Sequence, residues 1–156
     1  VIWARLINFS TQAFDERLVF SEIARAMIYQ NLWLGVGSGS FVLNMTENFR
    51  GILSPWLYQP VHNFFLMVAC ELGMIGLLLW LMVLGGMIKQ IGDSMRRIIK
   101  SERYYWKTYL ATLFSLLVLS LLDHYLYTAW AGMVLVFLII ALVWKDYRER
   151  RQELIK

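Results

Sequence analysis

Gln59–Leu81 reads QPVHNFFLMVACELGMIGLLLWL, and this stretch decides the fold. Its polar, proline-led start passes without a break into an apolar run. Phe64–Ile88 holds one charge, Glu71. At about 1.5 Å of rise per residue, a helix of this length exceeds the ~30 Å hydrocarbon core of a bilayer. The stretch therefore predicts a membrane-spanning helix with His62 at its polar entrance.

The composition is typical of an integral membrane protein. Of the 156 residues 59% are hydrophobic, seven are tryptophan, and the mean hydropathy is positive. An ordinary soluble domain of this length is less apolar. Because the chain opens at Val1 in the middle of an apolar pattern, we expect it to be part of a larger protein. The single cysteine, Cys70, lies inside the apolar run and predicts neither a disulfide nor a zinc site.

The net charge of +4 is concentrated beside the apolar runs. Eleven of the fifteen Lys and Arg residues lie in two segments, Lys89–Lys107 and Lys145–Lys156. Basic residues next to membrane spans mark the cytoplasmic side, where they meet anionic lipid headgroups. A nucleic-acid partner is the weaker explanation of this charge.

Two further apolar runs, Thr108–Leu122 and Ala129–Trp144, predict a second and a third span on either side of a short polar segment. With the two basic segments in the cytoplasm, both His62 and the pair Asp123–His124 end at the outer face. We therefore expect an all-α, polytopic transmembrane helix bundle. Residues 1–63 would form an extracytoplasmic amphipathic helix and loop. Residues 64–156 would form three transmembrane helices with a basic cytoplasmic loop and tail.

The segment before the first span is less apolar. Residues 13–31 predict an amphipathic helix that begins near Ser10 or Thr11, because apolar side chains recur at helical spacing between charged ones. Residues 34–41, LGVGSGSF, carry glycine at alternate positions and predict a turn, since they lack the Gly-Lys-Ser/Thr of a P-loop. Residues 42–60 predict an ordered loop at the membrane interface.

Two ionisable residues of the long apolar stretch are candidates for function. His62 either hydrogen-bonds a backbone carbonyl or acts as a general base, because its ordinary pKa lies near neutrality. Two histidines without ligand spacing predict no metal site. Glu71 would cost ~2.5 kcal/mol or more inside a bilayer, so it must be paired or protonated.

The other candidates are Arg17 and Asp123. Arg17 presents donors suited to phosphate oxygens, although a salt bridge with a neighbouring acid, Asp15, Glu16 or Glu22, is the simpler explanation. Arg25 and Arg50 carry the same ambiguity. Asp123 either caps a helix end or orients an imidazole, and spacing does not separate these roles or assign one to His124.

Taken in order, the motifs resemble the O-antigen ligase and O-antigen polymerase family of bacterial envelope glycosyltransferases. They are an arginine-bearing helix over 17–31, LGVGSGSF at 34–41, VHNFF at 61–65, ELGMIGL at 71–77, and Asp123 at the outer end of the penultimate span. The combination carries the resemblance, which covers most of the chain. Members of the family have many more spans, so this chain would be their C-terminal portion.

The resemblance implies a glycosyltransferase of the type-C membrane fold that needs no cofactor and no metal. Its donor would be an undecaprenyl-diphosphate-linked glycan at the extracytoplasmic face of the bacterial inner membrane, and its acceptor a glycan, a lipid A core or a protein. By the same resemblance His62 acts on the acceptor hydroxyl and Arg17 binds the diphosphate. Asp123, Glu71 and Asn63 would support substrate binding. Membrane lipids, and no nucleic acid, would complete the partners.

A non-enzymatic transporter or flippase subunit for envelope glycans is the alternative. In a transporter, Glu71 and His62 would belong to a path through a cavity at the bilayer midplane. A transferase would instead hold His62, Arg17 and Asp123 around one outward-facing pocket. The place of Glu71 in the tertiary structure therefore distinguishes the two.

Overall fold

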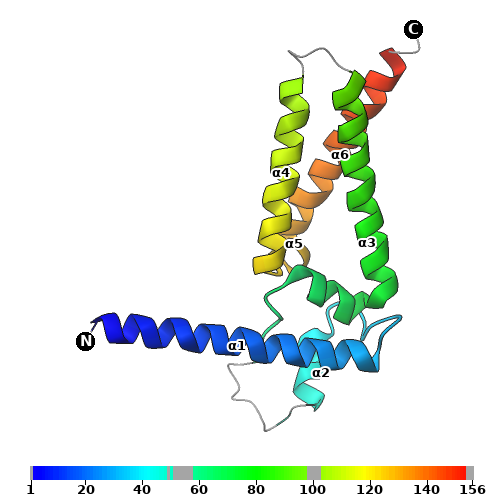
Figure 1. Ribbon diagram of the computed structural model, residues 1–156. Helices are drawn as coiled ribbons and strands as arrows, with labels where there is room; N and C mark the ends of the chain where they lie inside the picture. The colour runs from blue at the N-terminus through cyan, green and yellow to red at the C-terminus, as the bar shows by residue number, and fades with distance from the viewer. Residues whose placement is uncertain (1, 49, 51–57, 98–102, 154–156) are drawn as a thin grey trace. The chain divides into compact units, whose positions relative to one another are not determined.

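The computed structural model describes residues 2–48, 50, 58–97 and 103–153, and these contain helices and no strand. Their order along the chain is α1 (Ile2–Gln30), α2 (Phe41–Asn48), α3 (Phe64–Arg97), α4 (Arg103–Leu122), α5 (Tyr125–Thr128) and α6 (Trp130–Glu153) (Figure 1). The predicted all-α class is confirmed.

Three helices are long and apolar enough to cross a membrane, over Phe64–Arg96, Tyr104–Leu122 and Trp130–Glu149. They correspond to the three predicted spans. The basic segment 89–107 is predicted to be a loop, and this prediction is wrong for most of its length. α3 continues to Arg97, and α4 already begins at Arg103. Lys, Arg, Gln and Met favour a helix almost as strongly as alanine does, so basic residues do not end these helices.

α3 is interrupted at Gly73, whose φ of 67° and ψ of −172° are not helical. Before this break the side chains are largely buried, as in Val68 and Glu71. After it large apolar side chains are exposed, including 46% of Ile75 and 65% of Met82. The exposed apolar surface of α3 therefore begins just after Gly73. At about 1.5 Å per residue, residues 74–97 are still long enough for a ~30 Å hydrocarbon core.

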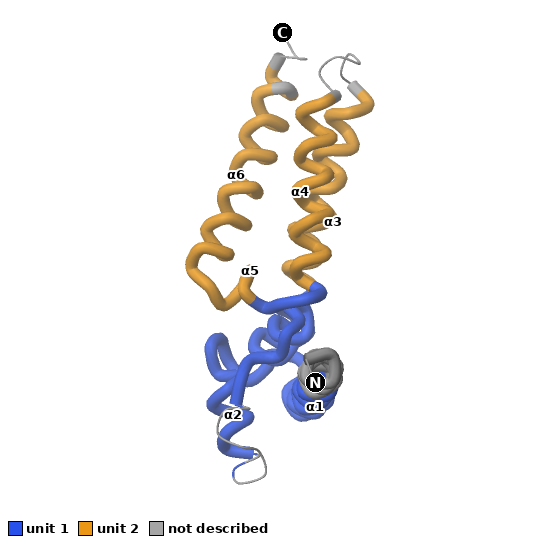
Figure 2. The backbone as a smooth tube through the Cα atoms, turned by 90° about the vertical axis from the view of Figure 1, so that its left-hand side faces the viewer, with its two compact units in different colours: residues 1–77, 121–124 blue, residues 78–120, 125–156 orange. Residues whose placement is uncertain are grey.

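The chain forms two compact units (Figure 2), and the first comprises Val1–Leu77 and Leu121–His124. Buried apolar residues recur along α1 at Phe20, Ile23, Ala24 and Met27, the period of an amphipathic helix. The unit also buries side chains from α2, the segment before α3 and α3 itself, namely Phe41, Met45, Val61, Phe64, Met67 and Val68. The Cys70 thiol donates to the Ala24 carbonyl at 3.2 Å and links α3 to α1.

The predicted amphipathic helix is therefore present but differs in detail. It begins at Ile2, so Ser10 and Thr11 lie inside it and do not cap it. Leu18 is 51% exposed and is not part of the buried face.

A continuous loop over 42–60 is also wrong, because α2 occupies Phe41–Asn48, while residues 51–57 lie outside the described part. The N-terminus of α2 is hydrogen-bonded by a residue that is distant in the sequence. The Phe41 amide donates to the carboxylate of Glu71, thirty residues further along the chain. A negative charge on unpaired amides stabilises a helix N-terminus.

The second unit comprises Leu78–Ser120 and Tyr125–Lys156. One buried cluster joins its three long helices, formed by Met87 and Ile91 of α3, Trp106 and Leu113 of α4, and Ile139 and Val143 of α6. The Tyr109 hydroxyl donates to Asp146 Oδ2 at 2.7 Å and adds a polar link between α4 and α6.

Candidate active site

His62 lies at the apex of a tight turn just before α3. The Asn63 amide donates to the Val61 carbonyl at 2.8 Å, and His62 has no positive φ, which is the pattern of an inverse γ-turn. Val61 is buried on one side of the turn. On the other side Asn63 caps α3, because its Oδ1 accepts the Leu66 amide at 3.0 Å. His62 is thus held between a buried residue and a helix cap.

Asp123 and His124 form the connection between α4 and α5. Asp123 Oδ1 accepts the main-chain amide of His124 at 2.7 Å. The side-chain amide of Asn63 donates to the Leu121 carbonyl at 3.3 Å. The end of α4 is therefore bound directly to the residue that follows His62. Both polar atoms of Asn63 serve these chain contacts, and a role of Asn63 on substrate stays a prediction.

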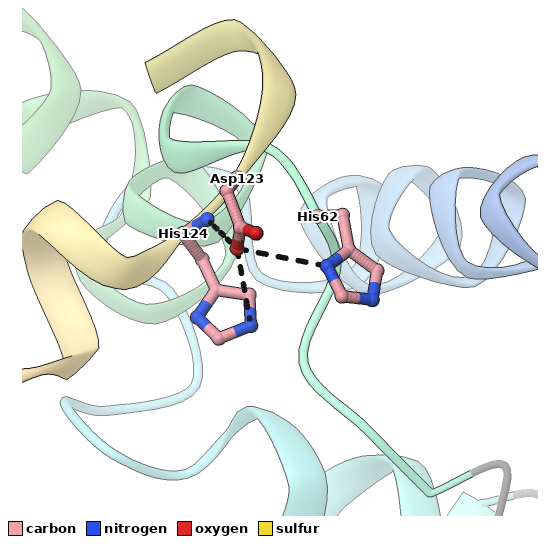
Figure 3. Close-up of side chains that lie close together, drawn as sticks. All are labelled: His62, Asp123 and His124. Atoms are coloured by element: carbon pink, nitrogen blue, oxygen red, sulfur yellow. Dashed lines mark hydrogen bonds and ion pairs between the residues drawn. The ribbon is translucent and has the colours of Figure 1, made fainter. Parts of the chain in front are cut away.

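His62, Asp123 and His124 gather around one carboxylate oxygen (Figure 3). We call these three residues the carboxylate–imidazole cluster. His62 Nδ1 lies 3.6 Å and His124 Nε2 lies 3.7 Å from Asp123 Oδ1, and the centroids of the two rings are 5.4 Å apart. The prediction that His62 and the Asp123–His124 pair come together in space is confirmed.

The two imidazoles differ in their surroundings. The His62 side chain is 24% exposed and that of His124 is 7% exposed. His62 Nδ1 is itself buried and makes no hydrogen bond within the described part of the chain. Because this atom faces Asp123, Nε2 lies on the opposite side of the His62 ring. His62 therefore presents Nδ1, and not Nε2, to the carboxylate.

Burial lowers the pKa of His124 below its ordinary value. The Asp123 carboxylate acts in the opposite direction, and a charge on His62 lowers this pKa further. Both effects follow from Coulomb interaction in a partly desolvated site. His124 is therefore neutral near pH 7. Sequence spacing left the role of His124 open, because no local sequence pattern shows that its ring lies beside the Asp123 carboxylate.

The cluster also offers three atoms of the kinds that bind metals, all within 4.8 Å of one another. In a tetrahedral zinc site with bonds of about 2.0–2.1 Å, ligand atoms lie only about 3.3 Å apart. The separations of 3.6 and 3.7 Å are wider. The carboxylate oxygen already accepts the His124 amide as well. The arrangement fits a carboxylate that orients imidazoles more closely than it fits a zinc site.

Glu71 contacts the turn formed by residues 34–41, which we call the glycine turn. Its side chain is 1% exposed, and its carboxylate accepts the Gly39 amide at 2.7 Å and the Phe41 amide at 3.1 Å. The expected pairing of this buried carboxylate is therefore supplied by backbone amides. These contacts give Glu71 a structural role, and substrate binding by Glu71 stays a prediction.

Arg17 is exposed on α1. It precedes Phe20 by three residues, and the Phe20 ring centroid lies 6.4 Å from that of His62. Residues three apart are neighbours on a helix surface, so Arg17 occupies the turn of α1 next to the one that contacts His62. Arg25, by contrast, pairs with Glu22. A role of Arg17 on a diphosphate stays a prediction.

Comparison with known proteins identifies one match over half of the chain. A family model described as O-Antigen ligase matches residues 3–81. The matched range contains Arg17, the glycine turn, His62 and Glu71, whereas Asp123 and His124 lie beyond it. No curated protein and no solved structure matches the chain.

Proposed function

The chain belongs to the O-antigen ligase family, and we propose that it transfers or polymerises a glycan carried on a lipid diphosphate. Family membership indicates an activity like that of an O-antigen ligase or polymerase, in a membrane protein with three helices able to span the bilayer. We further infer an undecaprenyl-diphosphate-linked donor, used at the extracytoplasmic face of the bacterial inner membrane. The observation that carries the proposal is the Asp123 carboxylate 3.6 Å from His62 Nδ1.

His62 is the general base in this proposal. Its Nε2 accepts the proton of an acceptor hydroxyl, while the hydroxyl oxygen attacks the anomeric carbon of the donor sugar. The carbon–oxygen bond to the diphosphate breaks, and the diphosphate leaves with the electron pair. A positioned base accelerates such a transfer by typically 10²–10⁴-fold.

Asp123 positions the base. With a proton on Nδ1 directed at the carboxylate, the ring presents Nε2 to the acceptor, as in a nucleophile–histidine–aspartate arrangement. The carboxylate also attracts the imidazolium that forms when Nε2 takes the proton. His124 stays neutral beside it because its pKa is lowered, so it adds little repulsion to the charged state of His62.

Arg17 stabilises the leaving group in this proposal. Negative charge grows on the diphosphate as its bond to the sugar breaks, and guanidinium donors are suited to phosphate oxygens. The support for this role is that Arg17 is exposed on the helix that contacts His62 through Phe20. No metal is required, because the base and the cation are both protein side chains.

The contacts of Glu71 favour a transferase over a transporter. A transport path centred on this carboxylate requires that ions or substrates reach it. Glu71 is instead 1% exposed, and its two oxygens are occupied by the amides of Gly39 and Phe41.

Substitution of His62 tests the proposal in reconstituted full-length protein with a lipid-linked donor and defined acceptors. We expect His62→Ala to reduce transfer by about 10²–10⁴-fold while donor binding persists. Asp123→Asn, which keeps the shape of the side chain, should lower kcat with little change in KM. Transfer should also persist in a metal chelator.

The two parts of this proposal fail in different ways. Full transfer by a correctly inserted His62→Ala protein would disprove the base assignment. Loss of transfer in a chelator, with recovery on adding back one metal, would show that the cluster works as a metal site. Offering lipid A core, free glycan and protein acceptors side by side would identify the acceptor class.

A further inference from the structure

An exposed apolar tip lies where α1 passes into the glycine turn. It consists of Tyr29, Leu32, Trp33 and Leu34, whose exposed fractions are 83%, 40%, 65% and 76%. The sequence between Arg25 and Glu47 carries no charged residue. A tip of this kind in a water-soluble loop would expose tryptophan and leucine without compensation.

Backbone hydrogen bonds fix the tip to α3 at the break. The Met74 amide donates to the Leu32 carbonyl at 2.8 Å, and the Ile75 amide donates to the Trp33 carbonyl at 3.4 Å. In the other direction, the Val36 amide donates to the Cys70 carbonyl at 2.8 Å. The backbone groups released by the break at Gly73 thus find their partners in the tip and in the glycine turn. The tip cannot move independently of this end of α3.

The glycines allow this close approach. A Cβ on Gly73 would lie 2.2 Å from the Trp33 carbonyl oxygen, and a Cβ on Gly35 would lie 2.5 Å from the Cys70 carbonyl oxygen. Both glycines also have a positive φ, of 67° and 69° respectively. The position of the tip against α3 is therefore set by main-chain contact, not by adaptable side chains.

The attachment point is also where the exposed surface of α3 becomes apolar. Ile75, which bonds the Trp33 carbonyl, has a side chain that is 46% exposed. It belongs to a helix long and apolar enough to span the membrane. Trp33 is therefore bonded to the residues of α3 at which its exposed apolar surface begins.

Most backbone amides of the glycine turn have acceptors within the protein. Amides of Gly35, Val36, Gly37 and Ser40 donate to carbonyls, and those of Gly39 and Phe41 donate to Glu71. Non-helical backbone at membrane depth is tolerated only when its polar groups are satisfied within the protein. The turn can therefore lie against lipid without leaving these amides unpaired.

We propose that the tip is an interfacial anchor, with Trp33 and Leu34 inserted among the lipids at the boundary between headgroups and acyl chains. Tryptophan and tyrosine are enriched at that boundary because their rings are amphipathic. The partner is the bilayer itself. This anchor does not depend on the catalytic proposal, since insertion of the tip requires no chemistry at His62.

Lipid-borne quenchers test the anchor in the full chain, reconstituted in vesicles of phosphatidylcholine and phosphatidylglycerol. A single NBD fluorophore is attached to Trp33→Cys or, separately, to Leu34→Cys. Cys70 is fully buried, so the parent chain should remain unlabelled. Glu47→Cys, exposed and polar on α2, is the matched control in water, and Leu79→Cys, exposed on α3, is the control in lipid.

We expect labels at 33 and 34 to lose most of their fluorescence to a nitroxide near the glycerol end of the acyl chain, and less to one at its middle. The label at 79 should show the reverse order, and the label at 47 should respond to neither. Quenching of 33 and 34 by aqueous iodide alone would overturn the anchor by placing the tip in water. Resistance to both lipid and aqueous quenchers would overturn it in favour of a protein partner.

Discussion

At the scale of single residues, the chemistry of the site depends on how one carboxylate oxygen is shared. Asp123 Oδ1 bonds the His124 amide and faces a ring nitrogen of each histidine. The carboxylate is therefore oriented by the adjacent backbone amide, and the backbone of His62 is held in place by the γ-turn and the cap at Asn63. Two segments far apart in sequence each bring a rigid part of the cluster.

His124 should make the stability of the protein depend on pH. Its pKa is lower in the folded protein than its ordinary value of about 6.5, so below that pH the unfolded chain binds a proton that the folded chain does not. The stability is fully present above the ordinary pKa and decreases as the pH falls below it. The melting temperature of the parent should therefore decrease more between about pH 7 and pH 5.5 than that of His124→Gln. Equal decreases in the two proteins would contradict the lowered pKa of His124 in the folded protein.

Two arginines on α1 provide a matched comparison. Arg17→Gln should raise the KM for the lipid-linked donor and lower kcat/KM by about 10–10²-fold, because a charge-assisted contact to phosphate contributes roughly 1.5–3 kcal/mol. Arg25→Gln removes the same charge from the same helix, but Arg25 pairs with Glu22. It should leave the donor KM nearly unchanged. Steady-state kinetics with varied donor separate the two, and equal effects would show that Arg17 acts only through net charge.

At the scale of elements, α3 is divided by one residue into two parts with different surroundings. The part before Gly73 is buried within the first unit, and the part after it exposes apolar side chains. Glu71 links this end of α3 to α2, because its buried carboxylate accepts the amide of Phe41, the first residue of α2, and that of Gly39 just before it.

Gly73→Ala should therefore destabilise the protein by about 2–4 kcal/mol, through a left-handed backbone and the loss of hydrogen bonds to the glycine turn. Its new Cβ would meet the Trp33 carbonyl oxygen within 2.2 Å. Gly39→Ala shares the positive φ but meets nothing within 4 Å, so it should cost about 1 kcal/mol. Gly85→Ala, in the helix and in open space, should be neutral or stabilising by up to about 1 kcal/mol. Free energies of unfolding in mixed micelles measure this order, and a harmless Gly73→Ala would disprove the role of the break.

At the scale of the whole molecule, the basic residues predict which ends of the helices face the cytoplasm. Eleven of fifteen Lys and Arg residues lie at 89–107 and 145–156. A membrane-impermeant maleimide should therefore label Glu47→Cys and Tyr125→Cys in intact cells, and Lys145→Cys only after lysis. The parent, with Cys70 buried, is the control. Labelling of position 145 from outside would reverse the proposed orientation and place the cluster in the cytoplasm.

The sequence by itself determined the helical class, the three spans and the amphipathic character of α1. These properties depend on length, hydrophobic period and the position of charges, all of which are local along the chain. It also brought His62 to the same end of the helices as Asp123, because two spans return the chain to its starting face.

Only the tertiary structure decided what lies between those elements. The break at Gly73, the amides that pair with Glu71 and the ring of His124 beside Asp123 each depend on a partner or a backbone angle that no local pattern displays. A positive φ can be used at any glycine, and a buried carboxylate can be satisfied by any donor. Packing between distant segments decides which glycine interrupts a helix and which donor pairs with the carboxylate. Local sequence patterns do not contain the free energy of that packing.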